Sequence, residues 1–228
     1  MSEKSDELET LGIIPDGNRR YADKNGISYG EAYQEGFKKV EEVYEWVIDH
    51  ESLDEVFFYA LSTENLKRDD KELDLLFDLF NRKVTKLADS DLIHDNEVNV
   101  DFLGKEEYLG PVKESMDRLE EVTSEYDDYS LNICMGYGGR TEIVDAAEKL
   151  AEKDMEFNEE NLQSQLYNDS DVDLVLRTGG YQRLSNFLLW QNSYAELFFS
   201  DHLWPELDKK EFDRAVDFYE STKRKFGK

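Results

Sequence analysis

Short β-rich runs alternate along the chain with longer segments that have a helical period. We expect strands at "LGII" (11–14), "LDEVFFYAL" (53–61), "EVNVDFLG" (97–104), "YSLNICM" (129–135), "DVDLVLRT" (171–178) and "AELFFS" (195–200). The last segment, "KKEFDRAVDFYESTKRKF" (209–226), repeats apolar residues at spacings of three and four, which is typical of an amphipathic helix. The alternation predicts an α/β fold with a mainly parallel, six-stranded sheet flanked by helices.

The length and charge of the chain limit its organisation and its partners. Its 228 residues suit one domain, which we expect over residues 11–228 after an acidic flexible tail over residues 1–10. The chain carries 54 acidic and 27 basic residues, and a formal charge of −27 argues against nucleic-acid binding. Molar salt shortens the screening length to about 3 Å, so we hypothesise a halophilic protein from a salt-accumulating cytoplasm. An unfolding titration in potassium chloride tests this, and stability that falls with added salt would contradict it.

Apolar segments give further expectations about location and packing. The single cysteine, Cys134, cannot form a disulfide within the chain, so we expect it to pack in the core. The first ten residues do not resemble a signal peptide, and no run approaches the ~18 apolar residues of a membrane span. We therefore expect a cytoplasmic protein. The runs "FFYAL" and "FLLWQNSYAELFF" are expected in the core, with the alternative that part of them lines an apolar channel.

Four loops that follow apolar runs combine small or polar residues with arginine. They are "PDGNRR" (15–20), "STENLKR" (62–68), "GYGGR" (136–140) and "RTGGYQRLSN" (177–186), and they hold Arg19, Arg20, Arg68, Arg140, Arg177 and Arg183. The carboxyl ends of parallel strands meet at one edge of a sheet, where ligands commonly bind. Guanidinium groups grip phosphate oxygens in pairs, so this distribution predicts a polyanionic ligand. Ion pairs with surface acids are the alternative.

One acid stands among these arginines. Asp16 would weaken anion binding unless it holds a divalent cation, and Mg²⁺ commonly takes one or two carboxylates together with substrate phosphates. Glu196 is the second candidate carboxylate, and an ordinary Asp-Gly-Asn turn is the alternative for Asp16. We expect "GRTEIVDAA" and "QRLSNFLLW" to begin helices whose amide groups favour anions. The chain has no Walker motif and no GxSxG motif.

Taken together, the loops resemble the cis-prenyltransferase family, which includes undecaprenyl diphosphate synthase and dehydrodolichyl diphosphate synthase. The similar segments are "GIIPDGNRRYA", "YALSTENLKR", "LNICMGYGGRTEIVDA" and "DLVLRTGGYQRLSNFLLWQNSYAELFFSDHLWPEL". The resemblance implies an α/β fold and a homodimer. It also implies a Mg²⁺-dependent enzyme that condenses isopentenyl diphosphate onto an allylic prenyl diphosphate with cis geometry. The product would be a polyprenyl diphosphate, a precursor of a glycan carrier lipid, through which the protein could contact a membrane.

The resemblance also implies roles for individual residues. Asp16 and Asn65 would be catalytic, and Asp16 and Glu196 would hold the metal. The residues that would bind the allylic diphosphate are Gly17, Asn18, Arg19 and Arg20, while Ser62 and Arg68 match the second motif of the family. The residues that would bind isopentenyl diphosphate are Arg177, Arg183 and Ser185. The terminal "KFG" resembles an ending that completes the site of the neighbouring subunit.

Some positions depart from the family pattern. Tyr29 and Tyr33 stand where many members carry an arginine and a histidine, and Tyr181 stands where glutamate is frequent. An accessory subunit that supports a separate catalytic chain is therefore the alternative to an enzyme. The presence of Asp16 together with Arg177, Arg183 and Ser185 favours the enzyme, because a pure scaffold has no physical need for a complete phosphate basin. Primers of ten, fifteen and twenty carbons remain alternatives.

Overall fold

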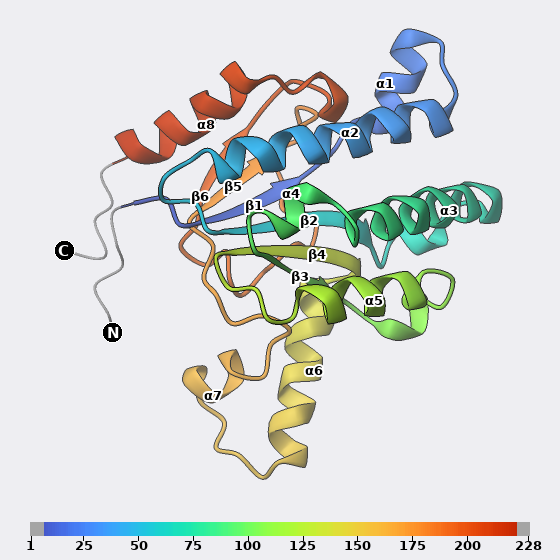
Figure 1. The fold of residues 1–228 in the computed structure, drawn as a ribbon. Coiled ribbons are helices and arrows are strands. Elements are labelled where there is room, and N and C mark those ends of the chain that lie inside the picture. Colours follow the sequence, from blue (N-terminus) through green and yellow to red (C-terminus); the bar gives the residue numbers. More distant parts are fainter. Residues whose placement is uncertain (1–6, 223–228) are drawn as a thin grey trace.

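The computed structural model describes residues 7–222 and arranges six strands of this range in one sheet (Figure 1). The strands are β1 (Thr10–Ile14), β2 (Glu55–Ser62), β3 (Val98–Leu103), β4 (Tyr129–Tyr137), β5 (Leu174–Arg177) and β6 (Glu196–Phe199). Their order is β3-β4-β2-β1-β5-β6, and every neighbouring pair is parallel. The predicted α/β fold with a parallel six-stranded sheet is confirmed.

Helices cover both faces of the sheet. They are α1 (Asn18–Asn25), α2 (Tyr29–Ile48), α3 (Asp70–Leu87), α4 (Asp91–His94), α5 (Lys113–Thr123), α6 (Gly139–Glu152), α7 (Glu159–Gln163) and α8 (Lys209–Ser221). In Figure 1, α2 and α8 lie above the sheet, and α6 extends away below it with α7 alongside. Within residues 7–222, no helix combines the length and the apolar character needed to cross a bilayer.

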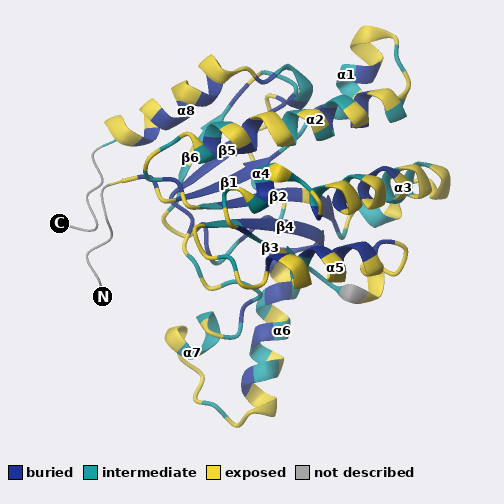
Figure 2. Cartoon of the chain, in the orientation of Figure 1, coloured by how far each residue is buried: buried dark blue, intermediate teal, exposed yellow. Residues whose placement is uncertain are grey.

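Alternate strand residues build two hydrophobic clusters, one on each face of the sheet. In β2, Val56 and Phe58 belong to the larger cluster with α2, α3, α5 and α8, whereas Phe57 and Tyr59 belong to the smaller one. Figure 2 shows the strands as mostly buried, with exposed residues on the outer faces of the helices. Cys134 is a free, fully buried thiol in the smaller cluster, so its predicted role in packing is confirmed.

The long helix α2 has sequence signals at its start and along its length. Ser28 and Glu31 form a capping box, in which the Ser28 hydroxyl accepts from the Glu31 amide at 3.2 Å and the Glu31 carboxylate accepts from the Ser28 amide at 2.8 Å. Buried residues then recur on one face of the helix: Ala32, Tyr33, Gly36, Val43, Tyr44 and Val47. This pattern places Tyr44 in the larger hydrophobic cluster and directs the Tyr33 hydroxyl to Glu72 of α3.

The structure differs from two expectations, one about the N-terminal tail and one about a helix, and it forms a helix at the first arginine-bearing loop. Leu8 is buried and Thr10 opens β1, so residues 8–10 belong to the fold rather than to the tail expected over residues 1–10. The segment "QRLSNFLLW" is not a helix, because Ser185 and Asn186 have left-handed φ angles of 52° and 67° that a right-handed helix does not accommodate. The sequence analysis did not anticipate α1, which begins at Asn18 within the first arginine-bearing loop and carries Arg19 and Arg20.

Candidate active site

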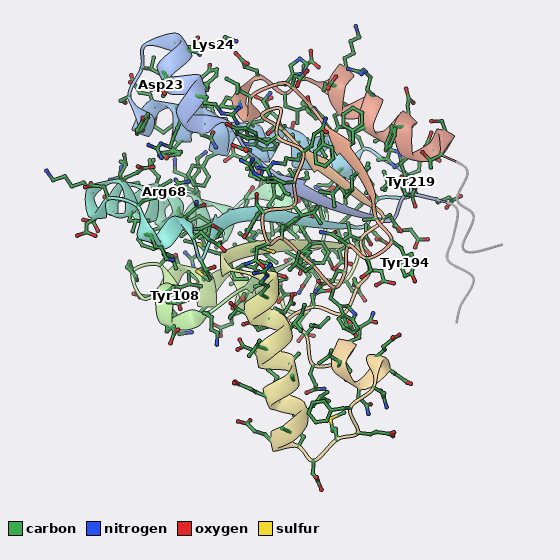
Figure 3. The ribbon with its side chains drawn as sticks, turned by 180° about the vertical axis from the view of Figure 1, so that it is seen from behind. Asp23, Lys24, Arg68, Tyr108, Tyr194 and Tyr219 are labelled. Carbon is green, nitrogen blue, oxygen red and sulfur yellow. The ribbon has the colours of Figure 1, made fainter. Side chains whose placement is uncertain are left out.

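The arginine-bearing loops follow β1, β2, β4 and β5, and the parallel sheet brings them to one edge. Arg68 is at this edge in Figure 3, whereas Tyr194 and Tyr219 lie toward the opposite end, near the chain termini. Most of the predicted site residues line one cavity there: Asp16, Gly17, Asn18, Arg19, Arg20, Ser62, Asn65, Arg68, Arg177 and Ser185. Arg183, Arg140 and Glu196 are not among its lining residues.

The cavity has a charged mouth and an apolar interior. Its volume is about 640 Å³, and its inner walls come from α2, α3, β2 and β4. Phe37 and Val40 line it from α2, and Phe77 and Phe80 line it from α3. Residues 58–61 of the run "FFYAL" also line it, so part of that run forms a channel wall, as the alternative to a core role proposed. Such a cavity suits a ligand with a polyanionic head and an apolar tail.

The Asp16 carboxylate joins two of the loops. One oxygen accepts from Arg20 Nη2 at 3.0 Å, and the other accepts from Arg177 Nη2 at 2.8 Å. The backbone carbonyl of Asp16 separately accepts from Thr178 Oγ1 at 2.8 Å and from the Trp204 amide at 3.0 Å. The backbone therefore holds Asp16 in place without help from its carboxylate.

Glycine is required at the residue that follows Asp16. Gly17 has a φ of 119°, and a Cβ atom there would lie 3.0 Å from the backbone of Leu203. A side chain would therefore combine backbone strain with a steric clash. This turn ends β1 and starts α1, and it directs Asp16 toward the arginines.

Arg177 is the most buried cation of the site. Its side chain is 4% exposed, and it donates from Nη1 to Ser185 Oγ at 2.8 Å and to the Arg183 carbonyl oxygen. Its Nε and the Oδ1 atom of Asn18 are buried without a hydrogen-bond partner among the described residues. Native structures rarely leave such atoms unpaired, so these two indicate that a ligand or water completes the site.

The second motif forms a closed turn at the same edge. Ser62 Oγ accepts from the Asn65 amide at 3.1 Å, and Asn65 Oδ1 accepts from the Ser62 amide at 3.4 Å. Burial would raise the pKa of Glu64 in this turn. Its backbone amide and hydrogen bonds from Ser62, Thr63 and Asn186 outweigh burial, so its pKa lies below the usual value. The side chain of Asn65 thus has a structural role whatever its part in catalysis.

Glu72 is a site residue that the sequence analysis missed. Its Oε1 accepts from the Tyr33 hydroxyl at 2.6 Å and from Arg68 Nη1 at 3.2 Å, and it lies 3.9 Å from Arg19 Nε. Burial, together with the hydrogen bond to Glu72, raises the pKa of the Tyr33 hydroxyl, which therefore stays protonated. The spacing of four residues between Arg68 and Glu72, which allows an ion pair near the start of α3, was the signal in the sequence.

The structure does not bring Glu196 to Asp16 within one chain. Glu196 opens β6 opposite Leu174, whereas Phe199 pairs with Arg177 three residues later. At about 3.3 Å per residue, Glu196 lies roughly 10 Å below the level of Arg177, toward the other edge of the sheet. The expectation that Asp16 and Glu196 hold the metal stays a prediction, and within one chain Glu196 lies at the start of a parallel strand, away from the edge that carries Asp16.

Two places in the described chain offer carboxylates for a metal ion. Glu97, Asp127 and Asp128 form an exposed cluster before β3 and β4, at the edge opposite the cavity. This cluster does not correspond to the predicted site. Asp16 does fit Mg²⁺, because its carboxylate is 28% exposed at the cavity mouth, where substrate phosphates and water would supply the remaining ligands.

Replacing Tyr29 and Tyr33 of α2 by basic residues tests the role of these two tyrosines. The Tyr29 ring lies 5.1 Å from the Arg19 guanidinium, and both Tyr29 and Tyr33 line the cavity. A phenol carries no positive charge at neutral pH, and charged hydrogen bonds are worth roughly 1 kcal/mol more than neutral ones. We therefore expect the double change Tyr29→Arg with Tyr33→His to lower, about tenfold, the apparent KM for the allylic diphosphate that the family resemblance implies. Tyr33→Phe is the control, and a KM that is unchanged or raised in the double variant would contradict this expectation.

A parallel sheet with an arginine-lined mouth above an apolar cavity defines an α/β protein that binds an amphiphilic polyanion. The chain belongs to the undecaprenyl diphosphate synthase family of cis-prenyltransferases, whose model matches residues 14–227, and it is a transferase of prenyl groups. It is 41% identical to the tritrans,polycis-undecaprenyl-diphosphate synthase (geranylgeranyl-diphosphate specific) of Pyrobaculum aerophilum, covering 96% of this chain and 95% of that protein.

Solved structures agree with this family membership. A probable undecaprenyl diphosphate synthase from Campylobacter jejuni matches with a TM-score of 0.84 and 37% identity, covering 97% of this chain and 99% of that one. Lavandulyl diphosphate synthase from Lavandula x intermedia, in complex with dimethylallyl diphosphate, matches with a TM-score of 0.87 and 25% identity. That match covers 99% of this chain and 100% of that one.

Proposed function

We propose that this prenyltransferase condenses isopentenyl diphosphate onto an allylic diphosphate with cis geometry and depends on Mg²⁺. The product is a polyprenyl diphosphate that serves as a precursor of a glycan carrier lipid. The observation that carries the proposal is the Asp16 carboxylate, held between Arg20 and Arg177 at the mouth of an apolar cavity. The protein acts in the cytoplasm and contacts a membrane through its product, which co-sedimentation with vesicles in the presence and absence of product tests.

The charged mouth supports loss of the allylic diphosphate. The allylic substrate becomes cation-like as its diphosphate leaves, and fixed cations stabilise the negative charge that develops on the departing oxygens. Arg19 and Arg20 stand on α1 at the mouth, and Arg177 stands beside them at the end of β5. Mg²⁺, when bound by Asp16 and the diphosphate, supplies further charge neutralisation. No covalent nucleophile is needed.

The apolar interior supports elongation of a hydrocarbon chain. Each added five-carbon unit that leaves water for the cavity contributes roughly 4 kcal/mol, at about 0.8 kcal/mol per methylene-sized group. Aromatic and aliphatic side chains of α2 and α3 provide the walls for this tail. The same walls exclude water from the reacting carbon atoms, which protects a cation-like centre from hydrolysis.

Geranylgeranyl diphosphate, with twenty carbons, is the primer that we propose. Relatives from Pyrobaculum aerophilum and Thermoplasma acidophilum, each 41% identical, are named as geranylgeranyl-diphosphate specific. In a mixture of primers of ten, fifteen and twenty carbons, we expect the twenty-carbon primer to be elongated at least fivefold faster. Sizing the products by chromatography measures this preference. Equal use of all three primers would contradict the choice of primer, and stimulation of a second prenyltransferase chain without turnover would favour an accessory subunit.

A homodimer is the assembly that we propose. The edge strand β6 has only β5 as a neighbour in the described sheet, and apolar side chains are exposed around it. Leu197 and Phe218 are each 37% exposed, and Tyr194 is 78% exposed. An uncovered apolar edge of this kind favours pairing with another chain. The terminal "KFG" that would complete a neighbouring site lies outside the described residues. Light scattering at working salt tests the assembly, and an active monomer would contradict it.

A further inference from the structure

The Tyr181 ring lies among three guanidinium groups at the mouth of the cavity. The Cζ atoms of Arg183, Arg20 and Arg177 lie 4.0, 4.6 and 6.0 Å from its centroid. All three distances fall within the range of cation–π interactions. Tyr181 is 42% exposed and lines the cavity, so ligands reach this cluster from solvent.

Only one of these arginines depends on the ring for its position. Arg20 and Arg177 each donate to the Asp16 carboxylate, and both make further hydrogen bonds to neighbouring loops. The guanidinium of Arg183 makes no ion pair and no hydrogen bond with any residue in the described part of the chain. The Arg183 guanidinium lies over the face of Tyr181, and it is the nearest of the three guanidinium groups to that ring.

The two residues before Tyr181 anchor its loop to the segment that follows β6. The Gly179 amide donates to the His202 carbonyl at 2.7 Å, and the Gly180 amide donates to the Ser200 carbonyl at 2.8 Å. Gly179 has a φ of 84°, and a Cβ atom there would lie 2.4 Å from Arg20 Nη2. Tyr181 therefore extends from a fixed turn, and its ring is a firm support rather than the end of a loose loop.

We infer that Tyr181 is a positioning residue that presents Arg183 to the diphosphate of isopentenyl diphosphate. Stacking uses the flat face of a guanidinium and leaves its in-plane N–H groups free to grip phosphate oxygens. A carboxylate at the same place would occupy those N–H groups and cancel the charge. The neutral ring therefore orients the cation without competing with the substrate. The identity of this diphosphate rests on the proposed function, whereas the stacking itself does not.

Calorimetric titration of the purified protein with inorganic pyrophosphate tests the inference without requiring turnover. The variants are Tyr181→Leu, Tyr181→Phe, Arg183→Ala and the double variant Tyr181→Leu with Arg183→Ala. We expect Tyr181→Leu to weaken binding about two- to fivefold, as the loss of one exposed cation–π contact predicts. Tyr181→Phe keeps the ring and should bind within a factor of 1.5 of the parent. Tyr108→Leu is the matched control, because Tyr108 is 40% exposed and does not line the cavity.

The double variant isolates the contact between the two side chains. If the ring acts through Arg183, adding Tyr181→Leu to Arg183→Ala should leave the pyrophosphate affinity unchanged. In steady-state assays, Tyr181→Leu should raise the KM for isopentenyl diphosphate by the same two- to fivefold while kcat changes by less than a factor of two. An equal loss in the Phe and Leu variants, or a full effect of Leu without Arg183, would overturn the inference. A parent that binds pyrophosphate but shows no turnover would count against the proposed function alone.

Discussion

Asp16→Ala is expected to lower turnover by roughly two to four orders of magnitude, the range for a group that acts directly on the reacting centre. The carboxylate is the acid that Arg20 and Arg177 surround, and it is also the one that fits Mg²⁺ beside a diphosphate. Its loss removes the proposed metal ligand and one hydrogen-bond partner from each arginine. Single-turnover assays with labelled isopentenyl diphosphate measure the effect on chemistry.

The fold should survive this change. The turn is held by the Asp16 carbonyl, which bonds to Thr178 and Trp204, and these bonds do not involve the carboxylate. Circular dichroism should therefore resemble that of the parent, whereas the Tm should fall by a few degrees because Arg177, which is 4% exposed, loses its ion-pair partner. Asp16→Asn is the matched control, since it keeps the shape and removes the charge. An alanine variant that is folded and turns over near the parent rate would show that Asp16 is only a turn residue.

Arg177→Ala is expected to damage both ligand binding and stability. The side chain is 4% exposed and joins Asp16, Ser185 and the carbonyl of Arg183. Removing one partner from a buried, hydrogen-bonded charge pair costs about 2 to 5 kcal/mol. We expect a loss of stability near the lower end of this range, about 2 kcal/mol, because Asp16 is 28% exposed and keeps Arg20 as a partner. For a chain of this length, about 2 kcal/mol lowers the Tm by roughly 4 to 8 °C.

The variant Arg177→Lys should affect pyrophosphate binding and thermal stability to different extents. Arg177→Lys keeps a positive charge but loses the planar fork that reaches Asp16 and Ser185 together. We expect Arg177→Lys to recover part of the Tm while pyrophosphate affinity stays at least tenfold below that of the parent. Differential scanning calorimetry and pyrophosphate titration measure the two quantities. Full recovery of affinity by lysine would show that Arg177 acts as a simple point charge.

The strands could be predicted from the sequence, but their order could not. The run around β5 is continuously apolar because both of its faces are covered, and this local signal identified the strand. The order depends on pairings between distant segments. Leu11 of β1, for example, pairs with Val56 on one side and Leu174 on the other. Nothing in the local pattern of β1 specifies those two neighbours.

The residues at the mouth of the cavity were partly predictable, because the carboxyl ends of parallel strands meet at one edge of the sheet. Loops that directly follow strands were expected to meet, and Asp16 and Arg177 do meet through an ion pair. The same rule does not place Glu196 at the mouth, because Glu196 is the first residue of β6 and does not follow the strand. Glu196 was a candidate as a carboxylate and by the family resemblance, and neither argument considers its place on the strand.

The contacts made by side chains in loops were beyond prediction. Tyr181 reaches Arg183 only because Gly179 and Gly180 adopt left-handed φ angles and bond to the segment after β6. Propensity indicates a turn at such a pair but not the direction of the side chain that follows. The bond from Tyr33 to Glu72 likewise depends on the packing of α2 against α3, two helices that are separated by a strand in sequence.

Incorporation of labelled isopentenyl diphosphate by the purified chain tests the central claim most directly. The chain is incubated alone with Mg²⁺ and geranylgeranyl diphosphate, over a series of potassium chloride concentrations. The proposed function predicts elongated polyprenyl diphosphates and the release of one pyrophosphate for each five-carbon unit added. Both signals should disappear when the primer is omitted or when a chelator removes Mg²⁺. Newly formed double bonds of the product should have the cis geometry by nuclear magnetic resonance. Absence of incorporation at every salt concentration, or products whose new double bonds are trans, would contradict the account.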